Sequence, residues 1–194
     1  TYVEYTPEVL RNGLYNFALN LNEPSTIINN LLQLKFGDAA KSTGRFLVNT
    51  TLGIAGVFDP ATSLGLPRQQ ESFGEVLGVW GVGNGPYLMV PGLGPTDVRN
   101  EVGGFVDRYY WPLAVIDFWP NLARVAIIGL EQRAALSKQE KLIEDSFDPY
   151  EFIKNAHFQN SEFKVYDGNV PIKENPEDED FDDFLDELDE ETID

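Results

Sequence analysis

Apolar residues recur at spacings of three and four positions along most of residues 1–167, and this period constrains the fold more than any other feature of the chain. It is the period of an amphipathic helix, whereas a half-buried strand would alternate apolar and polar residues. The first such segment starts at Thr6-Pro7-Glu8, where a hydroxyl cap, a proline and an acid predict a helix start. Its predicted apolar face comprises Leu10, Leu14, Phe17, Ala18 and Leu21.

Similar signals predict helices along the rest of this region. Pro24 ends the first helix or starts a second, which carries Ile27, Ile28, Leu31, Leu32 and Leu34. A third is expected over residues 38–52, with a buried side formed by Ala39, Thr43, Phe46, Leu47 and Thr50. Further helices are predicted at residues 70–77, 97–110, 120–136 and 137–145, with cap signals at Asp59-Pro60, Thr96-Asp97 and Asp148-Pro149. The sequence therefore predicts an all-α domain of seven or eight helices over residues 1–167.

Residues 78–95 differ from the helical segments because six glycines and three prolines interrupt them. The one ordered candidate here is a short extended piece at residues 86–90. The run Gly81-Val82-Gly83-Asn84-Gly85-Pro86 invites comparison with nucleotide-binding loops, but it lacks the third glycine of the dinucleotide spacing. No Gly-Lys-Ser/Thr occurs anywhere in the chain. A backbone turn that needs positive φ or close packing is the favoured interpretation.

Several classes of function are disfavoured by what the chain contains. There is no cysteine, which excludes thiolate metal sites and a cysteine nucleophile. His157 is the only histidine and no Gly-x-Ser-x-Gly elbow accompanies it, so we expect no catalytic residue and no enzyme activity. We also expect no cofactor and no dedicated metal site. The longest weakly charged stretch, 111–128, is interrupted by charges and a proline, so a spanning helix is not expected.

The negative charge of the chain is concentrated at its C-terminal end. The formal net charge is −18, and residues 174–194 hold 13 acidic and no basic side chains. This charge repels phosphate backbones, so nucleic acid is not an expected partner. Residues 168–180 resemble a flexible linker in composition, and the domain prediction assigns 168–194 to an acidic tail.

The acidic tail also contains an apolar stripe at helical spacing. Two interpretations stay open, a solubilising tail or a marginal helix that folds into a partner's groove. The stripe favours the second, because a purely solvating tail needs no large apolar residues. The predicted partner-binding residues are Phe181, Phe184, Leu185 and Leu188.

A cluster of aromatic residues lies between Phe105 and Trp119. Two interpretations are equally weighted, a buried core and an interfacial surface, because tryptophan and tyrosine favour the level of lipid headgroups. The second would place an in-plane helical protein at a membrane surface. The predicted anchoring residues are Tyr109, Tyr110, Trp111, Phe118 and Trp119.

The order and spacing of several short motifs resemble the MlaA (VacJ) family of Gram-negative outer-membrane lipoproteins. The match begins at Arg11-Asn12-Gly13, and its most specific portion runs from Trp80 to Tyr87. The other matching residues are Asn16-Phe17, Asn20-Leu21-Asn22-Glu23-Pro24, Arg45-Phe46, Asn49-Thr50, Gly53, Gly56, Asp59, Phe73-Gly74, Leu77-Gly78, Pro91, Gly94-Pro95, Arg99, Glu131-Gln132-Arg133, Asp148-Pro149-Tyr150 and Gln159.

This resemblance implies a ring-shaped helical protein in the periplasmic leaflet of the outer membrane. Family members remove mislocalised phospholipid from the outer leaflet through an amphipathic channel and pass it to a soluble periplasmic carrier, MlaC. They lie beside a trimeric outer-membrane porin of the OmpC/OmpF type, and they make or break no bond. We expect the tail to bind the carrier and the glycine-rich loop to form the channel rim, with Trp80, Gly81, Gly83, Gly85, Pro86 and Tyr87.

The sequence also departs from the family pattern. The lipidated cysteine and the helical segment that precede the first motif are missing, so we expect the chain to start downstream of them or to be a divergent member. Asn100, Lys154 and His157 stand where an acid, an arginine and a tyrosine are expected. The alternative function is therefore a repurposed MlaA-like structural subunit of a larger cell-envelope assembly. A lipid hydrolase is disfavoured for the reasons given above.

Overall fold

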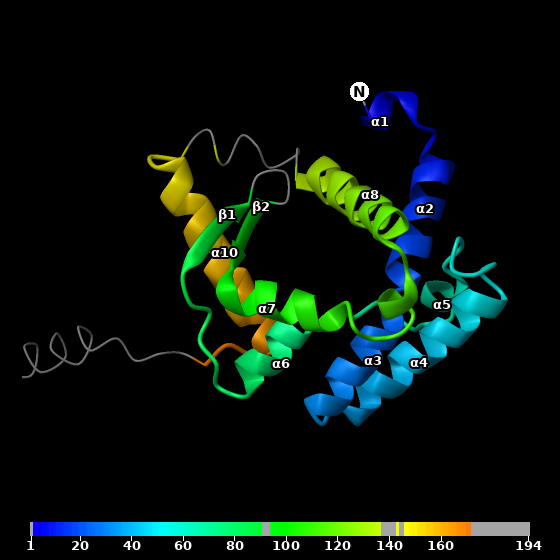
Figure 1. Ribbon diagram of the computed structural model, residues 1–194, viewed down its shortest axis with the longest axis horizontal. Helices are drawn as coiled ribbons and strands as arrows, with labels where there is room; N and C mark the ends of the chain where they lie inside the picture. Colours follow the sequence, from blue (N-terminus) through cyan, green and yellow to red (C-terminus); the bar gives the residue numbers. More distant parts are fainter. Residues whose placement is uncertain (1, 91–93, 137–142, 144–145, 172–194) are drawn as a thin grey trace, which may run out of the picture.

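The computed structural model describes residues 2–90, 94–136, 143 and 146–171. The predicted helical class is confirmed (Figure 1). The elements are α1 (Tyr2–Tyr5), α2 (Glu8–Asn20), α3 (Glu23–Leu32), α4 (Phe36–Thr51), α5 (Pro60–Ser63), α6 (Phe73–Val79), β1 (Tyr87–Val90), β2 (Gly94–Asp97), α7 (Val98–Asp107), the 3-10 turn η1 (Leu113–Val115), α8 (Phe118–Leu136) and α10 (Pro149–Val165).

Three of the predicted helix starts are confirmed by hydrogen bonds to their caps. The side chain of Asp59 accepts from the backbone of Thr62, and that of Asp97 accepts from the backbone of Asn100. Asp148 likewise accepts from the first turn of α10. The start of α2 differs from its prediction, because Pro7 is the cap residue and no side-chain hydrogen bond caps this helix. The short helix α1 was not predicted, and α5 was predicted only through the cap signal at its start.

The sheet in the described part of the chain is a two-stranded hairpin. β1 pairs antiparallel with β2, with Tyr87 opposite Asp97 and Val90 opposite Gly94. The sequence predicted only the first strand, because Gly94 and Pro95 are residues that strands disfavour. The hairpin leads directly into α7 and therefore connects the glycine-rich segment to the helical body.

The described helices follow one another around a closed circuit. α2 continues into α3, α3 contacts α6, α6 contacts α7, and the chain then leads through η1 to α8, which returns to contact α2. Outside this circuit, α4 packs against α3 and α5 against α4, while α10 packs against α6 and β2. Viewed down the shortest axis, these elements are arranged as a ring (Figure 1).

The polarity of the structure is inverted relative to a water-soluble domain. Its fully buried large side chains are mostly polar or charged, whereas several of the buried apolar residues are alanines. In α4, Leu47 is 56% exposed and Thr50 is also exposed, while the buried residues are Ala39, Ser42, Arg45 and Asn49. The prediction for this helix was therefore wrong except at Ala39: its buried face is mostly polar, and apolar Leu47 lies on the exposed face. The apolar face predicted for α2 is also largely exposed at Leu10, Leu14 and Phe17.

A buried ion cluster joins α3, α4 and α5. The guanidinium of Arg45, with no exposed surface, lies 3.3 Å from Glu23 and 2.9 Å from Asp59, and it donates to the carbonyl of Leu66. Arg68 lies 3.5 Å from Glu23 and 3.6 Å from Asp59. Burial would raise the pKa of Asp59, but hydrogen bonds from Asn49, Arg45 and Thr62 outweigh burial and lower this pKa to about 2. Two cations thus balance two carboxylates inside the protein.

Candidate functional site

The glycine-rich loop joins the end of α6 to β1. Gly81 and Gly85 have φ values of 88° and 72°, a conformation that glycine adopts without a steric cost. A Cβ on Gly83 would meet no atom within 4 Å. The loop follows a helix and precedes a strand, the reverse of the order that a phosphate-binding loop requires. Trp80 and Pro86 are exposed, and the ring of Trp80 contacts that of Phe73 edge-on at 6.1 Å.

Arg99 on α7 holds this loop in place, a role that the sequence did not predict. Its guanidinium donates to the carbonyl of Val82 at 3.2 Å and to the hydroxyl of Ser161 at 2.7 Å. Its backbone N–H donates to the carbonyl of Asn84 at 3.1 Å. Arg99 is only 7% exposed, so one side chain ties the loop, α7 and α10 together. Arg99 lies two residues after Asp97, the cap of α7, and this position in the sequence does not indicate such distant partners.

Tyr87 ends the loop and packs against α10. Its ring contacts those of Tyr150, His157 and Phe158 at centroid distances of 5.7, 5.8 and 6.0 Å. Nε2 of His157 lies 2.9 Å from the buried carboxylate of Asp97, the cap of α7. In the described part of the chain, His157 is hydrogen-bonded to no serine or threonine hydroxyl. The geometry therefore offers no nucleophile–base pair at the only histidine.

The aromatic cluster is largely exposed. Tyr109, Trp111, Phe118 and Trp119 are between 62% and 74% exposed, whereas Tyr110 is partly buried. The rings of Phe118 and Trp119 contact each other at 5.2 Å, and Trp111 contacts Phe46 at 6.5 Å. Tyr109, Tyr110 and Trp111 lie on the segment between α7 and α8, and Phe118 and Trp119 are the first two residues of α8. Of the two interpretations, an exposed surface agrees with this geometry and a buried core does not.

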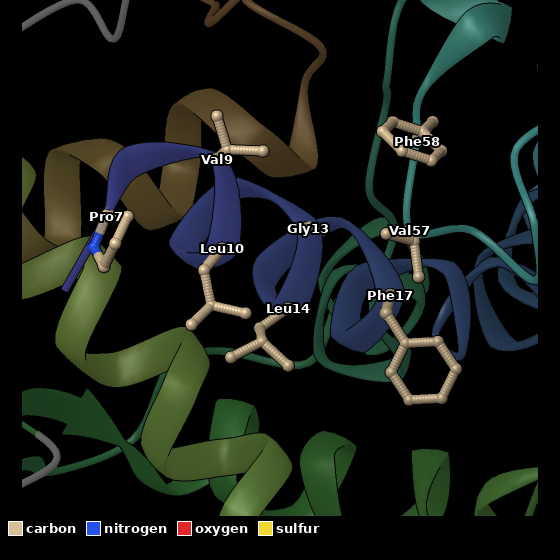
Figure 2. Close-up of a pocket in the computed structure, with 8 residues that line it drawn as sticks. All are labelled: Pro7, Val9, Leu10, Gly13, Leu14, Phe17, Val57 and Phe58. Atoms are coloured by element: carbon tan, nitrogen blue, oxygen red, sulfur yellow. The ribbon is translucent and has the colours of Figure 1, made fainter.

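An apolar hollow of about 610 Å³ opens along α2 and was not predicted as a site. Figure 2 shows Leu10, Leu14 and Phe17 pointing to the same side of the helix, with Val57 and Phe58 on the neighbouring segment. All the residues that line it are apolar or glycine; the others are Pro7, Val9 and Gly13. The spacing of Leu10, Leu14 and Phe17 was the available signal, but period alone does not say whether a face is buried.

The seam between α2 and α8 is closed by polar contacts. Glu131 of α8 accepts a hydrogen bond from the hydroxyl of Tyr2 at 2.8 Å and lies 3.6 Å from the guanidinium of Arg11. At the other end of the seam, Arg124 of α8 donates to the side-chain oxygen of Asn22 at 2.6 Å. Arg11, near the start of α2, contacts Glu131 late in α8, and Asn22, just after α2, contacts Arg124 early in α8. The two helices therefore run antiparallel.

Some predictions fall on residues that the structure does not describe. The tail residues Phe181, Phe184, Leu185 and Leu188 lie outside the described residues, as does most of the predicted helix at 137–145. Among the described residues, no group of three or more histidine, aspartate or glutamate side chains could hold a metal ion. None of the described helices is long and apolar enough to cross a membrane.

Comparisons with known proteins give a consistent result. A family model described as MlaA lipoprotein matches residues 1–164. The intermembrane phospholipid transport system lipoprotein MlaA of Escherichia coli K12 is 34% identical over 192 residues, covering 97% of this chain and 76% of that protein. The protein of the same name from Haemophilus influenzae is 33% identical over 174 residues, covering 86% and 68%.

Structural similarity points to the same group of proteins. A solved structure described as the structural basis for maintenance of bacterial outer membrane lipid asymmetry superimposes with a TM-score of 0.80. It is 36% identical in sequence, and the match covers 84% of each chain. An uncharacterized protein of Rickettsia felis is also 35% identical over 160 residues, covering 80% of this chain and 63% of that protein.

Proposed function

The chain belongs to the MlaA lipoprotein family, and from this premise we propose that it takes part in phospholipid transport that maintains the lipid asymmetry of the Gram-negative outer membrane. In this proposal it lies in the periplasmic leaflet of the outer membrane and removes mislocalised phospholipid from the outer leaflet. It binds and moves lipid without making or breaking a bond, so no residue is assigned a catalytic role.

The observation that carries the proposal is the inverted polarity of the structure. Exposing Leu52 at 71% or Phe36 at 64% to water is unfavourable by about 25 cal/mol per Å² of apolar surface, so many such residues together require an apolar surrounding. Helices that lie within one leaflet would place these exposed apolar side chains among the lipid chains. The exposed Tyr109, Trp111 and Trp119 then suit the headgroup level.

A route through the helical circuit would explain how the headgroup moves. A polar headgroup that crosses hydrocarbon without partners costs several kcal/mol, and a polar wall lowers this barrier. Helices of this circuit carry buried polar side chains, among them Asn29 on α3, Glu75 on α6 and Arg99 on α7, and the glycine-rich loop lies between α6 and the hairpin. We place the rim of the channel at this loop, at residues 80–87.

Replacing Gly83 by Trp is expected to slow phospholipid transfer several-fold while leaving the fold intact. A side chain there meets no atom within 4 Å, so its bulk enters open space rather than the core. The measurement is transfer of fluorescent phospholipid from proteoliposomes to a soluble acceptor, together with the thermal unfolding midpoint. Gly37→Trp is the matched control, because Gly37 also meets nothing within 4 Å and lies on α4, outside the helical circuit.

The two arms of this experiment test different statements. Absence of transfer by the unmodified chain would contradict the transport function and favour a structural subunit of an envelope assembly. Transfer that is unchanged in Gly83→Trp would contradict only the rim placement.

The acidic tail is proposed to recruit the soluble carrier. Residues 168–180 would reach roughly 20 Å as a random coil, enough to bring the apolar stripe at 181–188 to a partner in the periplasm. A partner groove with an apolar floor and basic borders would fit both the stripe and the charge. A trimeric porin is the proposed neighbour within the membrane.

Replacing Phe184 and Leu188 together by Asp should weaken binding of an MlaC-type carrier at least tenfold, because two apolar anchors are lost from the groove. The measurement is the dissociation constant of the full chain in detergent, and binding should also weaken as salt rises. The control is Ile172→Asp with Thr192→Asp, which adds the same charge outside the stripe. Equal affinities of the two double variants would rule out the stripe as the carrier contact.

A further inference from the structure

The two ends of the seam between α2 and α8 differ in how they balance charge. At one end, Arg11 faces the carboxylate of Glu131 at 3.6 Å. At the other end, the partners of Arg124 are two neutral amides, Asn22 at 2.6 Å and Asn121 at 3.0 Å. Within the described residues, no carboxylate is hydrogen-bonded or ion-paired to Arg124.

A second cation contributes to the electrostatic field at Arg124. Burial lowers the pKa of Arg124, and the positive charge of Arg108 lowers it further. Arg108 follows the last residue of α7, where the helix dipole favours a cation. It has no hydrogen-bond or ion-pair partner among the residues that the structure describes.

The carboxylates next to Arg108 and Asn22 in the sequence are engaged elsewhere. Asp107 accepts from Ser25 at 2.9 Å, from Asn29 at 2.8 Å and from the backbone of Phe73. Glu23 faces Arg45 and Arg68 in the buried ion cluster. A partly buried guanidinium that has neutral partners and another positive charge in its field is unfavourable, so an anion that binds there would stabilise it.

We infer that Arg124 and Arg108 form an anion subsite for the phosphate group of a phospholipid, an inference that rests on the proposed transport function. A guanidinium has five N–H donors, and Asn22 and Asn121 occupy two of those on Arg124. The remaining donors suit bidentate contact with phosphate oxygens. The two asparagines hold the guanidinium in place without neutralising it.

The test measures ligand-dependent thermal stability of the full chain in a phosphate-free maltoside detergent. The probes are a short-chain phosphatidylglycerol, a diacylglycerol with the same acyl chains, and inorganic phosphate. Arg124→Gln and Arg108→Gln are each expected to weaken phosphatidylglycerol binding about tenfold and to leave diacylglycerol binding unchanged. Lys154→Gln, which removes an exposed cation from α10, is the control and should bind phosphatidylglycerol as the unmodified chain does.

Stability without lipid separates this subsite from a purely structural role. Arg124→Gln also loses the hydrogen bonds to Asn22 and Asn121, so a lower lipid-free midpoint is expected for this variant alone, while Arg108→Gln should keep the midpoint of the unmodified chain. Phosphatidylglycerol affinity of both variants within twofold of the unmodified chain would overturn the subsite. Inorganic phosphate that stabilises only chains with Arg124 would identify a general phosphate site, while no effect of inorganic phosphate would identify a site that needs the lipid. If the unmodified chain prefers phosphatidylglycerol no more than diacylglycerol, the proposed function fails as well.

Discussion

Arg45→Ala is expected to lower the free energy of unfolding by about 3–5 kcal/mol, because it removes one partner from a buried ion cluster. Glu23 is 2% exposed, and without Arg45 it would keep only the longer contact to Arg68. Asp59 would lose a two-oxygen contact at 3.1 and 2.9 Å. The measurement is chemical unfolding in detergent micelles followed by circular dichroism.

Lys41→Ala provides the control for this prediction. Lys41 lies on the same helix and pairs with Asp38 at 2.8 Å, but its side chain is 50% exposed. The expected change is below about 1 kcal/mol, because solvent screens such pairs. A double variant with Arg45→Met and Glu23→Gln should recover part of the loss, since Arg68 and Asp59, 3.6 Å apart, then balance each other. Equal effects of Arg45→Ala and Lys41→Ala would contradict the importance of the buried cluster.

Local signals in the sequence were sufficient to predict most of the described helices. Asp59, Asp97 and Asp148 each accept hydrogen bonds from residues two or three positions later, so the interaction is contained within a few adjacent residues. The polarity of the helix faces could not be predicted in the same way. A spacing of three and four residues shows that two faces of a helix differ in polarity. It does not show which face is buried, because that depends on whether water or an apolar medium surrounds the protein. Leu47 lies outward and Arg45 inward, because the outer surface is apolar.

The sequence predicted only those features of the candidate site that follow from the backbone conformation of a single residue. Gly81 and Gly85 adopt the positive φ that the glycine run predicted. The residues that hold the site depend on distant partners, which no local pattern reveals. Arg99 reaches Ser161, 62 positions away, and Arg124 reaches Asn22, 102 positions away. Such contacts can be recognised only in the three-dimensional structure, where the helical circuit brings distant segments together.

The crossing of α6 and α7 depends on one glycine of an adjacent pair. A Cβ on Gly103 would overlap the backbone nitrogen of Gly74 and lie 2.5 Å from its Cα. Gly104, the next residue on α7, meets nothing within 4 Å. Backbone atoms of α6 cannot move aside as a side chain would, so a methyl group at position 103 must push the two helices apart.

Gly103→Ala is therefore expected to lower the free energy of unfolding by about 3 kcal/mol, the upper range for overpacking. Gly104→Ala should raise it by about 0.5–1 kcal/mol, since alanine favours a helix interior more than glycine does. The two substitutions add the same methyl group one position apart, so helix propensity cannot account for opposite signs. Unfolding in detergent micelles followed by circular dichroism measures both, and a stabilising Gly103→Ala would show that the helices do not cross at this distance. Because α6 leads into the glycine-rich loop and Arg99 of α7 holds that loop, Gly103→Ala should also slow phospholipid transfer, while Gly104→Ala should not.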